Sequence, residues 1–170
     1  VAGSTGTLQF VPAGFGGAGR LKIASYSAGT WYHATVSPDG NGTYDVALHG
    51  SPILVGGGPE GVVFVEAGAT LFETPSVLVC EYSGGRVVSY ELDGNSDPVL
   101  ATRRTFLSGL SGAEGGTRDP VTGDFLFSTF GGSNRVLVVR GFTPDCRPDV
   151  HAVCTLNVED FSAFRALYLA

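Results

Sequence analysis

A short glycine box that occurs twice at a fixed spacing constrains this chain more than any other feature. Gly58-Pro59-Glu60-Gly61 and Gly112-Ala113-Glu114-Gly115 lie 54 positions apart, and each comes just before a strand-like run. Gly3-Ser4-Thr5-Gly6 holds the equivalent place near the N-terminus, without the acid. A repeat of about 50 residues with short strands is typical of propellers and stacked arrays. The sequence therefore predicts about three copies of one β unit.

Each unit divides into short strand-like runs that are separated by turn residues. The first unit, about residues 3–50, contains four such runs, and the second, about residues 58–107, also contains four. The third unit, about residues 112–141, contains three, because a tail of different character begins at residue 143. Clusters of Gly, Pro, Asn and Asp end most runs, as tight turns between antiparallel strands require. We expect an all-β fold of three antiparallel, propeller-like blades over residues 1–142.

The predicted core lies between successive sheets, because one sheet of four strands cannot cover both of its own faces. The residues expected there are Phe10, Ile23, Trp31, Phe64, Leu78, Val88, Phe125, Phe127 and Val138. Closed propellers have four or more blades, and this chain supplies three. The edges that remain unpaired need cover. Two copies would make a six-unit ring, head-to-tail pairing would make a fibre, and a cut from a longer propeller is the third interpretation.

Composition argues against several kinds of partner. The formal charge is −6 and Lys22 is the only lysine, which argues against nucleic acid and against anionic membranes. No apolar run approaches the ~20 residues that a transmembrane helix needs. The chain is 43% hydrophobic and 15% charged, so it has enough apolar surface to form a core.

The three cysteines bear on the compartment in which the protein works. Cys146 and Cys154 lie eight positions apart in a turn-rich stretch, which suits a small disulfide loop in an oxidising compartment. Two free thiols are the alternative. Cys80 lies in an apolar run and is expected to be a buried thiol. We expect a secreted protein, extracellular or at the cell surface.

The glycine boxes resemble those of secreted bacterial β-propellers, of the regucalcin and lactonase type or of the NHL type. The resemblance covers about residues 3–141. In lactonase-like and regucalcin-like propellers, a glutamate before the innermost strand faces the central channel and binds a divalent metal, together with Asn and Asp ligands from other blades. The resemblance therefore implies Glu60 and Glu114 as metal ligands, with Thr5 in place of the acid in the first unit. A solvated carboxylate at each position is the alternative.

The tail, residues 143–170, resembles the C-terminal repeat of secreted planctomycete-like bacterial proteins, which is related to the calcium loop and helix of dockerins. The resemblance implies Asp149 at position 1 and Asp160 at position 12 of a calcium loop. Few oxygen ligands stand at the other loop positions, so we expect the Cys146–Cys154 bridge to close the loop. A helix is expected from about Asn157. Its apolar stripe, expected to dock on the β units, comprises Phe161, Phe164, Leu167 and Tyr168.

The other polar residues form no catalytic set in the sequence. His33, His49 and His151 are scattered and show no metal-ligand spacing. No nucleophile elbow and no phosphate-binding loop occurs. Asn41-Gly42-Thr43 matches a glycosylation acceptor and falls on an expected exposed turn.

These observations favour a non-catalytic β-repeat module that self-assembles into an oligomer or filament, or that has an adhesive role. A metal-dependent lactonase or other hydrolase, which would use Glu60 and Glu114 with calcium or another divalent cation, is one alternative. A carbohydrate-binding or protein-binding ectodomain is the other.

Overall fold

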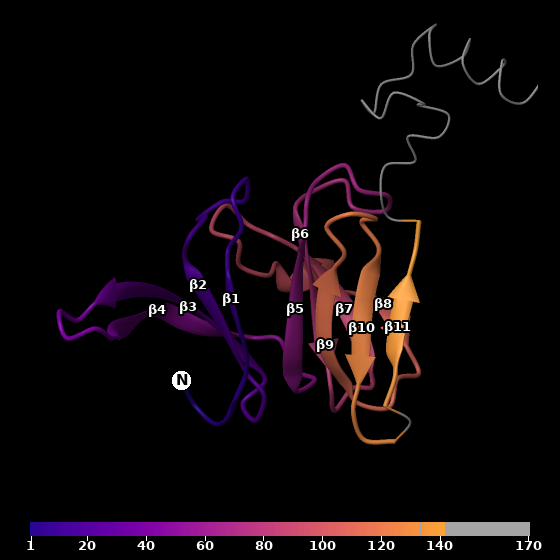
Figure 1. Cartoon of the computed structure of the whole chain (residues 1–170), viewed down its shortest axis with the longest axis horizontal. Helices are drawn as coiled ribbons and strands as arrows, with labels where there is room; N and C mark the ends of the chain where they lie inside the picture. Colours follow the sequence, from indigo (N-terminus) through magenta and orange to yellow (C-terminus); the bar gives the residue numbers. More distant parts are fainter. Residues whose placement is uncertain (133, 142–170) are drawn as a thin grey trace, which may run out of the picture.

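Three antiparallel sheets make up the computed structural model, which describes residues 1–132 and 134–141 (Figure 1). The first sheet has the strand order β1 (Thr5–Phe10), β2 (Leu21–Ser25), β3 (Thr30–Pro38), β4 (Tyr44–Leu54). The second has the order β5 (Pro59–Val65), β6 (Ser76–Glu81), β7 (Arg86–Glu91), β8 (Arg104–Ser108), with a 3₁₀ turn, η1 (Leu100–Thr102), before β8. The third consists of β9 (Ala113–Arg118), β10 (Phe125–Thr129) and β11 (Val136–Val139). The predicted all-β class with three antiparallel sheets of four, four and three strands is confirmed for these residues.

Each sheet is a meander in which strands that follow one another in the chain are neighbours. The first strands of the three sheets also adjoin, since β1 lies beside β5 and β5 lies beside β9 (Figure 1). No sheet closes on itself. No helix within the described part of the chain is long and apolar enough to cross a membrane.

The sheets stack face to face, and the middle sheet is covered on both sides. The first core holds Ala24 and Trp31 of the first sheet, with Val62, Phe64, Val77, Val79, Val88 and Tyr90 of the second. The second core holds Val63, Val65, Leu78, Cys80 and Val87 of the second sheet, with Ala113, Phe125 and Phe127 of the third. Alternate residues of β6 face opposite neighbours, as the two-residue period of a strand requires. All six residues of β6 are therefore buried.

We call the face that a sheet turns toward the next sheet in chain order its forward face, and the opposite face its rear face. The forward face of the first sheet carries Lys22, Ala24 and Trp31, and that of the second carries Leu78, Cys80 and Val87. The rear face of the first sheet carries Leu8, Phe10, Leu21, Ile23 and Ala34, which share that face through their pairing register. The forward face of the third sheet carries Leu126, Ser128, Val136 and Val138. Within the described residues, no fourth sheet covers either of these two end faces.

Two of the nine predicted core residues are exposed, so that part of the core prediction is wrong. Phe10 is 54% exposed and Val138 is 50% exposed. Phe10 lies on the rear face of the first sheet, opposite Leu21, and Val138 lies on the forward face of the third sheet, opposite Leu126. The prediction gave every sheet two neighbours, whereas the first and third sheets each have one within the part of the chain that the structure describes. Six others are buried between sheets as expected, namely Trp31, Phe64, Leu78, Val88, Phe125 and Phe127. Ile23 is also buried, but in a small cluster on the rear face of the first sheet.

Each glycine box forms a β-bulge at the start of the first strand of its sheet, where the register with the second strand shifts by one residue. The residues that pair just before the shift are Thr5, Pro59 and Ala113. The next residues, which enter the bulges, are Gly6, Glu60 and Glu114. Thr5 was expected at the place of the acid, but Gly6 occupies it. The sequence alignment of the boxes was wrong by one residue because it matched glycine to glycine.

Glycine at two positions lets the first strands approach one another closely. A Cβ on Gly6 would lie 1.9 Å from the carbonyl oxygen of Pro59. A Cβ on Gly61 would lie 2.8 Å from the carbonyl oxygen of Glu114 and 2.8 Å from the nitrogen of Gly116. No side chain fits at these distances, so the boxes fix the contact between successive sheets.

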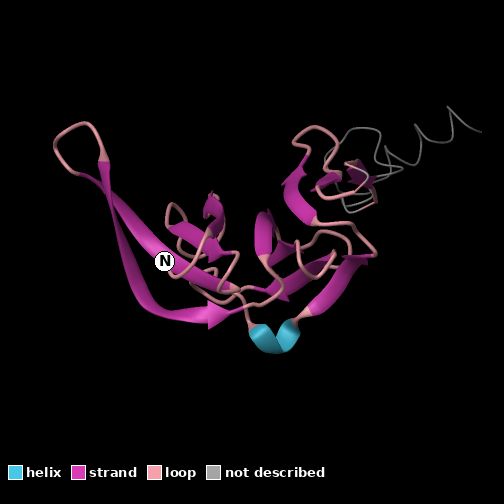
Figure 2. Cartoon of the chain, turned by 90° about the horizontal axis from the view of Figure 1, so that it is seen from below, coloured by secondary structure: helices cyan, strands magenta, loops and turns pink. Residues whose placement is uncertain are grey.

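The β3–β4 hairpin projects away from the rest of the chain (Figures 1 and 2). Its pairing register places Val36 opposite Val46, and Pro38 opposite Tyr44. Together with Leu48, which lies opposite Ala34, these side chains extend the rear face of the first sheet. Tyr44, Val46 and Leu48 are exposed. The hairpin therefore carries an exposed apolar row, which needs an explanation.

Candidate functional site

Glu60 and Glu114, the candidate metal ligands, lie at matching bulges of adjacent strands. Burial raises the pKa of the Glu60 carboxyl, and the negative charge of Glu114 raises it further. Gly6 supplies no side chain at the matching bulge of β1. Over residues 1–132 and 134–141, no group of three or more His, Cys, Asp or Glu side chains lies close enough to hold a metal ion. Glu60 and Glu114 thus have no third ligand of these four residue types nearby among the described residues, and their role as metal ligands stays a prediction.

Several predicted residues lie outside the described part of the chain. These are Asp149 and Asp160 of the implied calcium loop, the Cys146–Cys154 pair, and the expected helix from about Asn157. They stay predictions. Asn41 lies on the exposed turn of the β3–β4 hairpin, and its backbone N–H donates to Asp39 Oδ1 at 2.8 Å. Its glycosylation also stays a prediction.

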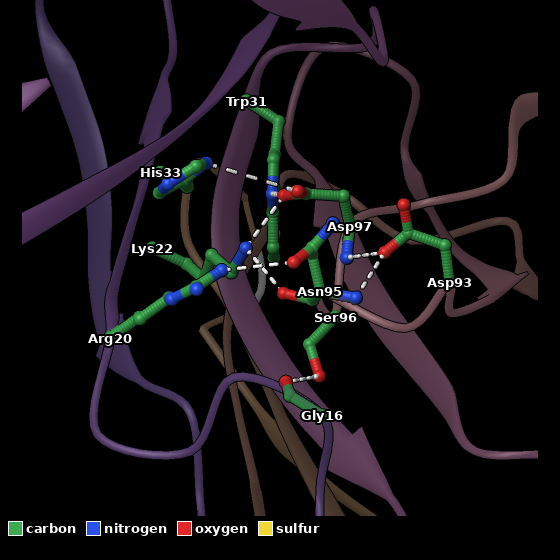
Figure 3. Close-up of polar contacts among 9 residues, drawn as sticks. All are labelled: Gly16, Arg20, Lys22, Trp31, His33, Asp93, Asn95, Ser96 and Asp97. Carbon is green, nitrogen blue, oxygen red and sulfur yellow. Dashed lines mark hydrogen bonds and ion pairs between the residues drawn. The ribbon is translucent and has the colours of Figure 1, made fainter. Parts of the chain in front are cut away.

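A polar cluster, which we call the Asp97 clasp, joins the loop after β7 to the first sheet (Figure 3). Its members are Arg20, Lys22, Trp31, Asn95 and Asp97. Asp97 Oδ1 accepts hydrogen bonds from Lys22 Nζ at 2.7 Å and from Trp31 Nε1 at 2.9 Å. Lys22 Nζ, whose side chain is 1% exposed, also donates to the carbonyl oxygen of Asn95 at 2.9 Å, and Arg20 donates to Asn95 Oδ1 at 3.0 Å. Burial of the only lysine is tolerated because its charge is paired and hydrogen-bonded.

Asp93 shapes the loop that carries the clasp. Its Oδ1 accepts from the backbone N–H of Asn95 at 2.8 Å and from that of Asp97 at 2.9 Å. The hydroxyl of Ser96 donates to the carbonyl oxygen of Gly16 at 2.6 Å, which adds a second link to the first unit. The charged groups of the clasp bind one another across two sheets. The clasp therefore acts as a structural link between units.

His33 and His49 form a pair that the sequence analysis missed. They are opposite each other in the register of β3 and β4, and their ring centroids lie 5.2 Å apart. His33 Nδ1 lies 4.0 Å from Asp97 Oδ2. Burial lowers the pKa of His33, and the positive charge of Lys22 lowers it further. The two histidines stand eight positions on either side of Asn41, so the expected turn there was the signal that predicts their pairing.

A second buried carboxylate, Glu81, ends β6. Arg86 Nε donates to its Oε2 at 2.6 Å, and Arg103 Nη2 contacts both carboxylate oxygens at 2.8 and 2.9 Å. Arg103 Nε also donates to the hydroxyl of Tyr90 at 3.1 Å. The hydrogen bonds to Glu81 raise the pKa of Arg103. Glu81 is fully buried and bound to two guanidinium groups, so it serves the second sheet as an internal ion pair.

A hollow of about 560 Å³ lies beside the second sheet. Ser76 and Ser89 contribute to its lining, together with Glu73, Glu91 and Arg104. None of the described residues that line it is a histidine, cysteine or lysine. The hydroxyl of Ser76 donates to the carbonyl oxygen of Thr74 at 2.9 Å. The described lining residues thus do not include the histidine or lysine base that commonly activates a serine nucleophile.

Comparison with known proteins adds no relative to this description. No family model, no curated protein and no solved structure matches the chain significantly.

Proposed function

We propose that the chain is a secreted, non-catalytic, propeller-like β-repeat module that associates with further copies of itself in a structural or adhesive role. One observation carries the proposal: over residues 1–132 and 134–141, both ends of the stack of sheets present exposed apolar side chains without a neighbouring sheet. The resemblance to propellers is supported by the meander order of each sheet and by the adjacent first strands.

The third sheet supplies the first of these faces. Val136 is 68% exposed and Val138 is 50% exposed, and both share a face with Leu126 and Ser128. At the places of Leu126, Ser128 and Val136, the second sheet has Leu78, Cys80 and Val87, which are fully buried against the third sheet. At the place of Val138 it has Ser89, which is half-buried. β11 is also an outer strand, because the third sheet has no fourth strand among the described residues. Exposed edges and apolar faces of this kind favour association.

The first sheet supplies the second face. Leu8 and Phe10 are exposed on its rear face, and the apolar row of the β3–β4 hairpin continues that face outward. Leu21 and Ile23 form a small cluster with Ala34 at its centre. The described residues thus form two inter-sheet cores and leave exposed apolar side chains on the two outer faces of the stack.

The secreted location is the sequence-based part of the proposal. It depends on the Cys146–Cys154 loop, and quantifying free thiols in the unfolded chain tests it. Self-association is tested separately, by sedimentation velocity of the full chain over a hundredfold range of concentration. We expect species larger than the 17.5 kDa monomer whose proportion rises with concentration. A monomer at every concentration would contradict the proposal.

A further inference from the structure

We infer that copies of this chain associate head to tail, with the forward face of the third sheet of one copy packed on the rear face of the first sheet of the next. The inference rests on the proposed self-association and names its two surfaces. In this contact, two copies pack against each other in the way that successive sheets pack within one chain. Each end face is therefore covered by a second copy of this chain.

The pairing register shows that the end faces are the missing halves of the internal contact. Ser25, Glu81 and Thr129 each pair with the residue before a bulge, so they occupy equivalent places. Three residues before each of them stand Lys22, Leu78 and Leu126. Lys22 contacts the second unit and Leu78 packs against the third sheet. Leu126 holds the same place with no following sheet in the described residues.

The same comparison applies to the rear faces. The residues compared here lie four and two positions before Ser25, Glu81 and Thr129. They are Leu21 and Ile23 in β2, Val77 and Val79 in β6, and Phe125 and Phe127 in β10. The residues of β6 are buried against the first sheet, and those of β10 are buried against the second. Leu21 and Ile23 hold the equivalent places of the first sheet, where they are already buried in a small cluster with Ala34. The residues of this rear face that are exposed to a further sheet are Leu8 and Phe10, with Val46 and Leu48 of the hairpin. A second copy supplies that sheet with its Leu126, Val136 and Val138.

The turns after the third strands give an independent reason to expect this direction. In the Asp93 turn, the carboxylate accepts from the N–H groups two and four residues later, and the loop grips the preceding unit through the Asp97 clasp. The Asp39 turn lies 54 positions earlier and repeats this geometry, since Asp39 Oδ1 accepts from the N–H of Asn41 at 2.8 Å and of Thr43 at 3.0 Å. Among the described residues, no sheet precedes it for this turn to contact.

The ion pair that links the first two units has no charged counterpart at the equivalent places of the inferred contact. Within the chain, Asp97 of the turn pairs with Lys22 of the preceding forward face. At the place of Asp97 the Asp39 turn carries Thr43, and at the place of Lys22 the third sheet carries Leu126. Both members of the ion pair are thus replaced by uncharged residues. At these two places association therefore buries no unpaired charge, which would be costly.

The contact is heterologous, because it joins two different surfaces, so it closes into a ring or continues as a filament. We test it with two double variants that each remove one surface. The rear-face variant is Val46→Glu with Leu48→Glu, and the forward-face variant is Val136→Glu with Val138→Glu. All four residues are exposed, so both variants are expected to fold, which circular dichroism and thermal melting check. Val121→Glu, at a 90% exposed turn residue outside both faces, is the control.

We expect each double variant alone to need an at least tenfold higher protein concentration than the parent to associate. The control is expected to associate at the same concentration as the parent. An equimolar mixture of the two double variants, each with one intact face, is expected to form a one-to-one heterodimer by sedimentation velocity.

Three results would overturn the inference. If the parent associates and both double variants associate equally well, other surfaces make the contact, and the proposed function stands. If both variants are monomeric and their mixture is also monomeric, the two faces do not bind each other. If the parent itself is monomeric at every concentration, the proposed function fails together with the inference.

Discussion

Replacing Lys22 by leucine tests how the first two units are held together. Lys22 is 1% exposed and its ammonium binds Asp97 at 2.7 Å, while the side chain of Asp97 is 15% exposed. The substitution leaves the Asp97 carboxylate with one hydrogen bond to Oδ1, from Trp31 Nε1. Leucine suits the position itself, since Leu78 and Leu126 stand at the equivalent places of the other sheets.

The magnitude follows from the partner that remains. Breaking a buried ion pair by removing one partner costs about 3–5 kcal/mol. Asp97 keeps the Trp31 bond and some contact with water, so we expect the lower end, about 3 kcal/mol. For a chain of this length, that lowers Tm by roughly 6–12 °C. Replacing both partners, Lys22→Leu with Asp97→Thr, removes both charges and leaves Trp31 Nε1 without its acceptor, so we expect a total cost of about 1–2 kcal/mol.

Urea unfolding followed by tryptophan fluorescence measures these differences, because Trp31 is the only tryptophan and belongs to the clasp. Arg20→Leu is the matched control, since the Arg20–Asn95 contact is exposed, and it is expected to cost less than ~1 kcal/mol. The reasoning is refuted if Lys22→Leu costs no more than the control. It is also refuted if the double variant costs as much as the sum of its two single changes.

Three further predictions follow from the contacts between strands and from the burial of titrating groups. Gly61→Ala forces a Cβ to within 2.8 Å of backbone atoms of β9 and is expected to cost about 1–3 kcal/mol in thermal melting; Gly94→Ala, with nothing within 4 Å, is its control, and equal costs for the two would contradict the close approach. The pKa of Glu60 is raised on folding, so Glu60 favours the folded state at acid pH and loses that contribution as pH rises through its folded pKa. Glu60→Gln is therefore expected to raise Tm at pH 7 and to leave it unchanged below about pH 4; a lower Tm at pH 7 would contradict this, and would point to a bound cation. Burial raises the pKa of Cys80 to about 12, so a thiol reagent at pH 8 is expected to label no Cys80 in the folded chain. In denaturant we expect one thiol in total, whereas labelling of all three cysteines would disprove the Cys146–Cys154 bridge.

The strands and their grouping were predictable because their signals are local. Alternation and turn residues mark each run, so the three sheets and their strand numbers follow from the sequence. The first unit was expected to end at about residue 50, whereas β4 continues to Leu54. The bulges could not be predicted in this way. Thr5 pairs with the second strand and Gly6 enters the bulge, and this one-residue shift in register leaves no mark in the local sequence pattern. The His33–His49 pair lay within reach, since symmetry about Asn41 predicts it.

The contacts between units were beyond local reasoning. Lys22 and Asp97 stand 75 positions apart, and nothing near either residue indicates the other. An acid at the end of an apolar strand, Glu81, reads as a surface residue until Arg86 and Arg103 are seen to converge on it. The exposure of Phe10 and Val138 depends on the number of neighbouring sheets, which is a property of the whole chain.

An image of the assembled full-length chain at molecular resolution, by electron microscopy, tests the central claim most directly. Our account predicts particles with more than three successive sheets, in which the third sheet of one copy, with Val136 and Val138, lies on the first sheet of the next, with Phe10 and Val46. Isolated particles of three sheets, or copies joined through any other pair of surfaces, would contradict it.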